Sequence, residues 1–335
     1  MIRLLMSVKP CGSSAKPLAV LVLLLSCVLA AVPYVGMAQD TPDESSSGGE
    51  PAVDETVTDE AGGAEPETPG SPPERRRNPF KRIGPQPLTQ EQREEAERLR
   101  KVAAKYGTDP TAIVGRMQLT SQYLDLTPHA NATVSTARVD LPFRGDYLLR
   151  MDMPFLRTFD PNSPGTTSHH GLSDLAVTPG WRVYNTPEYA PLVGAVVTFP
   201  TAANDTLGFG KDTVGPSFAT ARFLPRWDSF LIGLLKYQTS VGGDPSRKDV
   251  SFFTVAAQVN SFWGQGWWTI VQSVWNVDFE RSGKSSMVME FEGGKNLIGR
   301  FGAYVRPGVG IYGRDVAGAY IWNIEVGIRY MFTSF

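Results

Sequence analysis

The chain ends in YIWNIEVGIRYMFTSF (residues 320–335), and this stretch decides the fold class. Every second residue from Trp322 to Phe332 is apolar or aromatic, whereas the residues between them include Glu325 and Arg329. Successive side chains of a β-strand point to opposite faces, whereas an amphipathic helix repeats every 3.6 residues. The stretch is therefore predicted to be a strand with one apolar face and one polar, charged face.

The same two-faced pattern recurs from residue 113 onward, in segments separated by Gly, Pro, Asn and Asp. These segments are long for a soluble sheet but fit tilted strands that cross a bilayer. About twelve strands are expected: 113–125, 130–142, 145–157, 172–184, 189–200, 212–223, 227–241, 250–261, 266–280, 286–293, 299–312 and 318–333.

A soluble β-sandwich would also alternate, so the position of the aromatic residues matters. They gather near predicted strand ends, as in the interfacial girdles of membrane barrels. Closing the sheet into a barrel gives every backbone N–H and C=O group of the strands a hydrogen-bond partner. An open sheet edge in hydrocarbon would leave such groups without partners. The sequence predicts an all-β protein, a closed antiparallel transmembrane β-barrel over residues 111–335. The girdle residues are expected to be Trp181, Tyr184, Trp227, Phe230, Trp263, Trp267, Phe279 and Trp322.

The lengths of the predicted connections alternate, which indicates an orientation. Tight connections are expected at 142–145, 185–188, 224–226, 262–265 and 294–296. Long connections are expected at 158–171 and 201–211. Outer-membrane barrels have short periplasmic turns and longer external loops. With the N-terminus in the periplasm, the pattern predicts a barrel in the bacterial outer membrane.

The N-terminus, residues 1–38, is predicted to be a cleaved signal peptide. Basic residues precede an apolar run over 18–32, and small residues follow at 36–38. Both cysteines of the chain, Cys11 and Cys27, lie before the expected cleavage point. The mature protein is therefore expected to contain no disulfide.

Residues 39–87 are predicted to be a disordered linker that precedes the barrel. The part up to about residue 73 is acidic and rich in Ser, Gly, Pro, Thr and Glu, so it cannot bury enough apolar surface to offset its ordering entropy. A basic cluster follows, which is either a solvated run or a contact for lipid phosphates or for the acidic segment. It comprises Arg75, Arg76, Arg77, Lys81 and Arg82.

One helix is expected over 88–107, on the periplasmic side. Thr89 and Gln92 have the spacing of a capping box, and Gly107 lies just beyond the predicted end. A thin apolar stripe leaves several placements open: docking at the barrel rim, plugging the lumen, pairing with another helix, or a mostly exposed helix. The stripe consists of Ala96, Leu99, Ala103 and Tyr106.

Two segments, GLSDLAVTPGWRVY (171–184) and GAVVTFPTAANDTLGFGKDTVGPSFA (194–219), resemble a bacterial outer-membrane family named after the MetA pathway of phenol degradation. The resemblance covers roughly 111–335 and departs at Ser173, where the family has glycine. It implies a closed barrel, and members of the family are called transporters of hydrophobic or aromatic compounds. The matching residues are Gly171, Asp174, Pro200, Thr201, Asp205, Leu207, Gly208, Gly210, Gly215 and Pro216.

The polar faces of the last four predicted strands carry charges of both signs, which are the candidate lumen residues. Opposite charges on neighbouring strands stabilise a barrel wall, so these residues form either a salt-bridged ladder or a polar pathway for a solute. They are Asp278, Glu280, Glu290, Glu292, Arg300, Arg306, Glu325 and Arg329.

The long loops carry candidates for a gate: His169, His170, Asp205, Lys211 and Asp212. Adjacent loop residues do not provide the fixed geometry of a nucleophile and its base. We therefore expect no catalytic residue, no enzyme activity, no metal site and no cofactor. The net charge of −2 predicts no nucleic-acid partner.

The function expected from these patterns is transport of small solutes, hydrophobic or aromatic if the resemblance extends to function. The second possibility is a structural barrel that anchors a periplasmic arm, and the third is a lipid-modifying enzyme. The expected partners are outer-membrane lipid and the barrel-assembly machinery, which would read the last strand through Phe332 or Phe335.

Overall fold

A computed structural model of the chain describes residues 88–332, except 128–129, 164 and 315. The predicted signal peptide (1–38), the linker with its basic cluster (39–87) and the last residues (333–335) lie outside the described residues. The part described forms one compact unit, in which a helix contacts the barrel directly.

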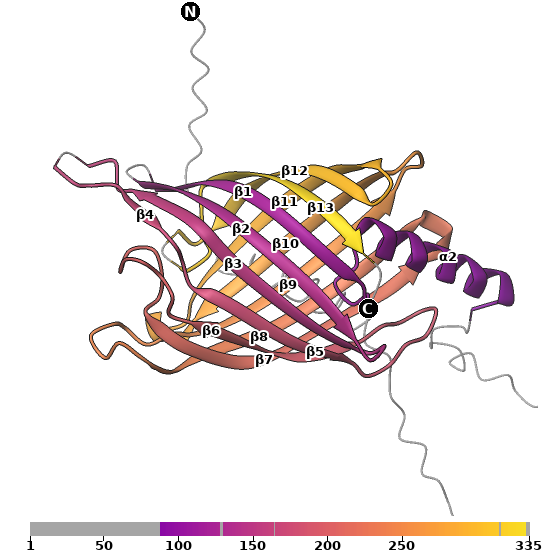
Figure 1. Cartoon of the computed structure of the whole chain (residues 1–335), viewed down its shortest axis with the longest axis horizontal. Coiled ribbons are helices and arrows are strands. Elements are labelled where there is room, and N and C mark those ends of the chain that lie inside the picture. The colour runs from indigo at the N-terminus through magenta and orange to yellow at the C-terminus, as the bar shows by residue number, and fades with distance from the viewer. Residues whose placement is uncertain (1–87, 128–129, 164, 315, 333–335) are drawn as a thin grey trace, which may run out of the picture. The chain divides into compact units, whose positions relative to one another are not determined.

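In the described part of the chain, twelve strands pair antiparallel with their neighbours and close into a barrel, because the first strand also pairs with the last. The predicted fold class is confirmed (Figure 1). The barrel strands are β1 (Gly115–Thr127), β2 (Ala130–Phe143), β3 (Tyr147–Asp160), β5 (Leu175–Arg182), β6 (Leu192–Phe199), β7 (Lys211–Leu224), β8 (Ser229–Gly243), β9 (Ser251–Phe262), β10 (Trp267–Asp278), β11 (Lys284–Ile298), β12 (Phe301–Tyr312) and β13 (Trp322–Phe332).

Three short elements accompany the barrel strands. The strand β4 (His169–Gly171) pairs with β3 beyond the point where β3 leaves β5. The 3-10 turns η1 (Pro225–Trp227) and η2 (Phe279–Arg281) connect β7 to β8 and β10 to β11.

One expected boundary is wrong. The glycines near residue 294 suggest a turn at 294–296, but β11 continues to Ile298. A Cβ at Gly294 would overlap the indole ring of Trp268 on the neighbouring strand. The glycine therefore provides space for a large lumenal side chain within a strand, and the turn follows at 299–300.

The two faces of the barrel wall differ as the alternation predicts. On β13, Val326 and Ile328 are 49% and 50% exposed, whereas Asn323 and Arg329 are 2% and 3% exposed. An apolar outer band on this scale is stable only against hydrocarbon, so the barrel is a transmembrane one. Among the described helices, none is long and apolar enough to cross a bilayer.

The aromatic residues predicted to form the girdle lie at or next to the strand ends with exposed side chains, with one exception. Trp227 and Trp263 are 73% and 67% exposed in the turns between strands. Phe230 was expected to belong to this girdle, but its side chain is fully buried and packs on the inner side of the wall. Phe230 lies opposite Phe223 on the lumenal face of the wall, and a helix covers this part of the lumen.

The two ends of the barrel differ in their connections. Most turns at one end are short (144–146, 225–228, 263–266 and 299–300), and we call this the short-turn end. The other, the long-loop end, carries the segments 161–174, 200–210, 244–250 and 313–321. The helix α2 (Gln90–Tyr106) lies at the short-turn end, where β13 also finishes (Figure 1).

The sequence determines where α2 begins and ends. The Thr89 side chain accepts a hydrogen bond from the Gln92 N–H, and the Gln92 side chain accepts one from the Thr89 N–H, so the expected capping box is present. Gly107 ends the helix with a φ of 64°, a conformation that glycine adopts without strain.

The apolar stripe of α2 packs on the lumenal wall at the short-turn end. Ala96, Leu99 and Ala103 are fully buried. The barrel residues that they join are Ala221 and Phe223 on β7 and Phe230 and Ile232 on β8. Among the placements that the sequence left open, the structure shows α2 seated in the mouth of the barrel.

Candidate functional site

The C-terminal end of α2 is held by two arginines that point into the lumen. The carbonyl oxygen of Gly107 accepts hydrogen bonds from Arg116 Nη1 (2.7 Å) and from Arg329 Nη1 (3.2 Å). The free carbonyls at a helix C-terminus carry partial negative charge, which cations stabilise. The two guanidinium groups therefore bind the end of the helix inside the barrel.

Aromatic rings continue the contact further into the lumen. The Tyr106 ring stacks on Trp268, with 5.8 Å between the ring centroids. Trp268 is 1% exposed, and its Nε1–H donates to Glu292 at 2.6 Å. The end of α2 is thereby connected to the charged residues of the lumen.

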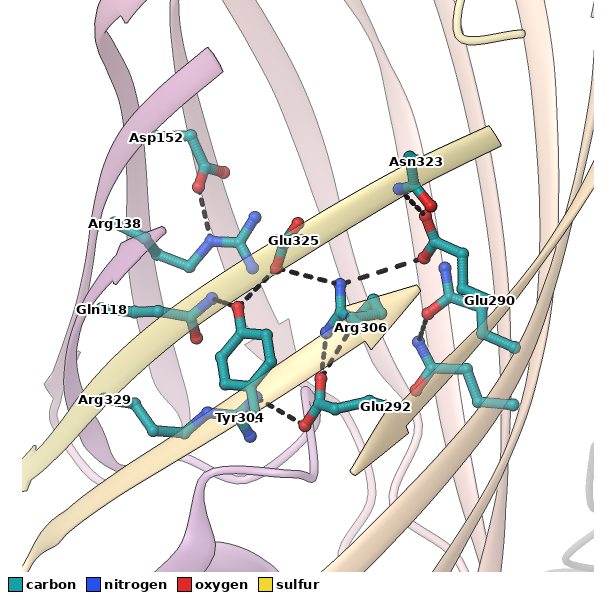
Figure 2. A network of polar contacts seen from close by, with 12 residues as sticks. Gln118, Arg138, Asp152, Glu290, Glu292, Tyr304, Arg306, Asn323, Glu325 and Arg329 are labelled. Atoms are coloured by element: carbon teal, nitrogen blue, oxygen red, sulfur yellow. Dashed lines mark hydrogen bonds and ion pairs between the residues drawn. The ribbon is translucent and has the colours of Figure 1, made fainter. Parts of the chain in front are cut away.

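We call Glu290, Glu292, Tyr304, Arg306, Glu325 and Arg329 the lumenal charge cluster (Figure 2). Arg306 lies between three carboxylates: it is paired with Glu292, and its Nη1 lies 3.5 Å from Glu325 and 4.0 Å from Glu290. Arg329 pairs with Glu292 at 2.8 Å.

Hydroxyl and amide groups complete the cluster. The Tyr304 hydroxyl donates to Glu325 (2.5 Å) and accepts from Gln118 Nε2 (3.0 Å) on β1. The exposed fractions of Glu292, Tyr304 and Arg329 are 1%, 3% and 3%. These groups therefore pack against one another on the inner wall, and the end of α2 contacts them through Tyr106 and Gly107.

A second set of charges lies on β1, β2 and β3, and it was not predicted from the sequence. Asp140 pairs with Arg116 (2.5 Å) and with Arg150 (2.8 Å), and Arg138 pairs with Asp152 (2.5 Å). The spacing of these residues could have predicted the set. Both β2 and β3 carry an Arg and an Asp two residues apart, which places the two side chains on the same face of the strand. The antiparallel register places each carboxylate opposite an arginine.

Three of the eight predicted lumen charges lie outside the cluster. Asp278 ends β10, and its side chain accepts the N–H of Glu280 in η2 and lies 3.4 Å from Arg281. Glu280 is exposed in η2, and Arg300 is exposed in the turn before β12. Alternation assigns a face only within a strand, and these residues lie where the strand ends. The other five, Glu290, Glu292, Arg306, Glu325 and Arg329, meet in the cluster.

The five candidates for a gate also separate. His169 and His170 lie in β4, opposite Phe159 and Thr158 of β3. Lys211 begins β7 and pairs with Asp249 at 3.0 Å, whereas Asp212 pairs in register with Gly242 of β8. Asp205 lies in loop 200–210 with an exposed side chain.

Loop 200–210 is fixed at both ends by the Asp174 carboxylate. Asp174 Oδ1 accepts the N–H of Ala202 (3.2 Å), and Oδ2 accepts the N–H of Phe209 (2.6 Å). A Cβ at Gly208 would overlap this carboxylate, so glycine is required there. The residues that carry the family resemblance thus form a structural contact between two loops.

Arg247, in the loop between β8 and β9, holds the other side of loop 200–210. Its Nη2 donates to the carbonyl oxygens of Asp205 (2.6 Å) and Gly208 (2.9 Å). The loop is therefore tied both to the start of β5 and to the β8–β9 connection at the long-loop end.

Replacing Asp174 with alanine is expected to release loop 200–210. Two hydrogen bonds from main-chain N–H groups to a carboxylate are lost, and each such bond contributes about 1.5–3 kcal/mol. Cleavage of the folded barrel within 200–210 by an added protease should become at least roughly tenfold faster. Asp205→Ala, which keeps the main-chain carbonyl that Arg247 uses, is the control and should leave the cleavage rate near wild type.

Solved structures with the same architecture exist, although the sequence comparisons give no relative. No protein-family model matches the chain, and no curated protein matches it. An outer membrane channel of Pseudomonas putida F1 superposes with a TM-score of 0.52 at 11% identity, covering 66% of this chain and 96% of that chain. The fold is that of an outer-membrane barrel.

Two porins give weaker superpositions. The NanC porin has a TM-score of 0.48 at 11% identity, covering 64% of this chain and 98% of that chain. The KdgM porin, in a complex with disordered oligogalacturonate, has a TM-score of 0.45 at 6% identity, covering 65% and 99%. At these identities the likeness concerns the fold, and the function has to be argued from the lumen.

One buried carboxyl group lies between α2 and β1, next to the C-terminal end of the helix. Asp109, between α2 and β1, is 3% exposed, and its Oδ1 accepts the N–H (2.8 Å) and the hydroxyl (2.7 Å) of Thr111. Burial raises the pKa of Asp109 above its ordinary value of 3.8, although Thr111, Arg100 and Arg182 act in the opposite direction.

A carboxyl group whose pKa is higher in the seated than in the released state favours seating when it is protonated. Seating is therefore strongest below the ordinary aspartate pKa, and it weakens as the pH rises through the seated-state pKa. Protease cleavage of α2 in the wild type should be faster at pH 7.5 than at pH 5. Asp109→Asn should show similar rates at both pH values, and an unchanged pH dependence would contradict this role.

Proposed function

We propose that the protein is a channel of the bacterial outer membrane for small solutes, and that α2 closes it at the short-turn end. The observation that supports this most is a polar inner wall combined with a helix that is held by side-chain and terminal contacts. Short turns are typical of the periplasmic side of such barrels, so the proposal places α2 in the periplasm.

The inner wall formed by β9 and β10 supports a polar solute. Its wall carries hydroxyl and amide side chains, including a Thr254–Asn276 hydrogen bond of 2.7 Å and a Gln258–Gln272 hydrogen bond of 2.6 Å. Such groups exchange readily with water and with hydroxylated solutes. Transport of hydrophobic or aromatic compounds, which the resemblance implies, stays a prediction that the same assay addresses.

The test is solute uptake by liposomes that contain the purified mature chain. With α2 displaced, swelling in arabinose is expected to exceed both that of protein-free liposomes and that of the wild type, whose lumen α2 closes. Swelling in a small aromatic alcohol can be compared after correction for its passage through lipid alone. Equal rates with and without protein, both for the wild type and for a variant with α2 displaced, would refute the channel.

One observation favours the second candidate function, an anchor for a periplasmic arm. The apolar stripe of α2 is buried against the wall at the short-turn end, and the helix leads directly into the segment before residue 88. If the barrel stays closed with α2 displaced, and a cellular phenotype follows deletion of residues 39–106, the anchor replaces the channel.

A further inference from the structure

A lysine on the lumenal face of β8 has no ion-pair partner among the described residues. Lys236 is half-buried, and its neighbours in register are Ser217 on β7 and Thr254 on β9. Both neighbours are hydroxyl residues. An ammonium group in a narrow barrel loses part of its hydration, which is costly unless an anion accompanies it.

The wall around Lys236 contains no carboxylate. The lumen-facing positions of β5 to β9 in the described residues are otherwise small, hydroxyl, amide or apolar, except for Arg182 and Lys211 near the two ends. Lys211 is already paired with Asp249 at 3.0 Å, and Arg182 with Asp146 at 2.9 Å. Lys236 therefore makes this half of the wall positive at mid-depth.

The charges that act on Lys236 come from the facing strands β2 and β3. They are Asp152, which attracts the ammonium, and Arg138, which repels it. Asp152 is already paired with Arg138 at 2.5 Å, and the Arg138 side chain is 34% exposed. Lys236 and Arg138 together carry two positive charges, and Asp152 carries one negative charge. One positive charge is therefore left in excess.

The other lumenal carboxylates are committed elsewhere. Glu292 accepts from Arg306, Arg329 and Trp268. Glu325 accepts from Tyr304, and Glu290 from Tyr320 and Asn323. None of these groups forms an ion pair with Lys236, so the positive charge is available to a solute.

We propose that Lys236 and Arg138, with the hydroxyls of Ser217 and Thr254, form a binding site for small organic carboxylates inside the lumen. The ammonium provides up to three donors, the guanidinium a planar pair, and the Ser217 hydroxyl a further donor. The Thr254 hydroxyl, which donates to Asn276 at 2.7 Å, adds a polar wall beside the ammonium. This inference rests on the proposed channel and specifies its solutes as small anions.

The test measures ion selectivity in planar bilayers with α2 displaced by Leu99→Asp, so that the lumen is open. In a potassium acetate gradient, the reversal potential should show a preference for acetate. Adding Lys236→Gln should lower the acetate-to-potassium permeability ratio by roughly threefold, the effect of one unit charge a few ångströms from the path in a water-filled lumen. Lys236→Glu should reverse the preference.

The matched control is Lys295→Gln, which removes the same charge from the outer face, where Lys295 lies 4.8 Å from the Trp267 ring centroid. Its permeability ratio should equal that of the Leu99→Asp parent. A conducting parent whose ratio is unchanged by Lys236→Gln would overturn the anion site and leave the channel intact.

If neither the Leu99→Asp parent nor its Lys236→Gln variant conducts, a binding measurement tests whether the anion site exists. The thermal unfolding midpoint of the detergent-solubilised wild type should rise in citrate relative to chloride at equal ionic strength. This rise should be lost in Lys236→Gln and kept in Lys295→Gln. A citrate effect without conductance supports the site and refutes the channel, whereas the absence of both refutes both.

Discussion

Replacing Leu99 with aspartate is expected to displace α2 from the barrel and to raise conductance and liposome swelling at least tenfold. Leu99 is fully buried against the lumenal wall, and its burial contributes roughly 1.5–3 kcal/mol. The aspartate would also place an unpaired carboxylate on an apolar surface, at a further cost of several kcal/mol. Because about 1.4 kcal/mol changes a population tenfold, the released state should dominate.

Single-channel recording and swelling rates measure this effect, and protease cleavage of α2 shows whether the helix has left. Lys101→Asp is the matched control, because it introduces the same residue on the exposed face of the same helix. It should conduct like the wild type. A displaced helix with an unchanged, closed barrel would contradict gating by α2 and favour the anchor.

Replacing Arg306 with glutamine is expected to destabilise the barrel by about 3–5 kcal/mol, the cost of removing one partner of a buried ion pair. Arg306 is the cation shared by Glu290, Glu292 and Glu325, whose side chains are at most 12% exposed. Without it, three carboxylates face each other with Arg329 as the remaining cation of the cluster. The midpoint of guanidinium unfolding in lipid–detergent mixtures should fall at an unchanged slope.

Arg300→Gln tests whether this effect depends on position. Alternation predicts Arg300 on the lumenal face, but the structure places it in an exposed turn, so its loss should change stability by less than about 0.5 kcal/mol. Conductance separates the two interpretations of the cluster. In the Leu99→Asp background, Arg306→Gln should leave conductance unchanged if the cluster is a ladder that stabilises the wall, and should alter it if solutes pass along these charges.

The sequence alone determined what depends on short-range periodicity. Alternation in segments such as 322–332 assigns each side chain to lipid or to lumen, since consecutive strand residues point to opposite faces. The twelve strands and the antiparallel closure follow from it, because hydrocarbon tolerates no unpaired strand edge. The limits of α2 are equally local, as they depend on the capping box at Thr89 and on Gly107.

Only the tertiary structure decided which side chains meet across the barrel. Gln118 on β1 reaches Tyr304 on β12 across β13, where Gly327 leaves room for the tyrosine ring, and the register of this closure cannot be read from either segment. Glu280 and Arg300 look like lumen residues by alternation, but they lie in turns between the strands. The seating of α2 was likewise open, because a stripe of two alanines, a leucine and a tyrosine fits many surfaces. The lumenal pocket that accepts it is built from β7 and β8, more than a hundred residues away along the chain, and exists only once the barrel has closed.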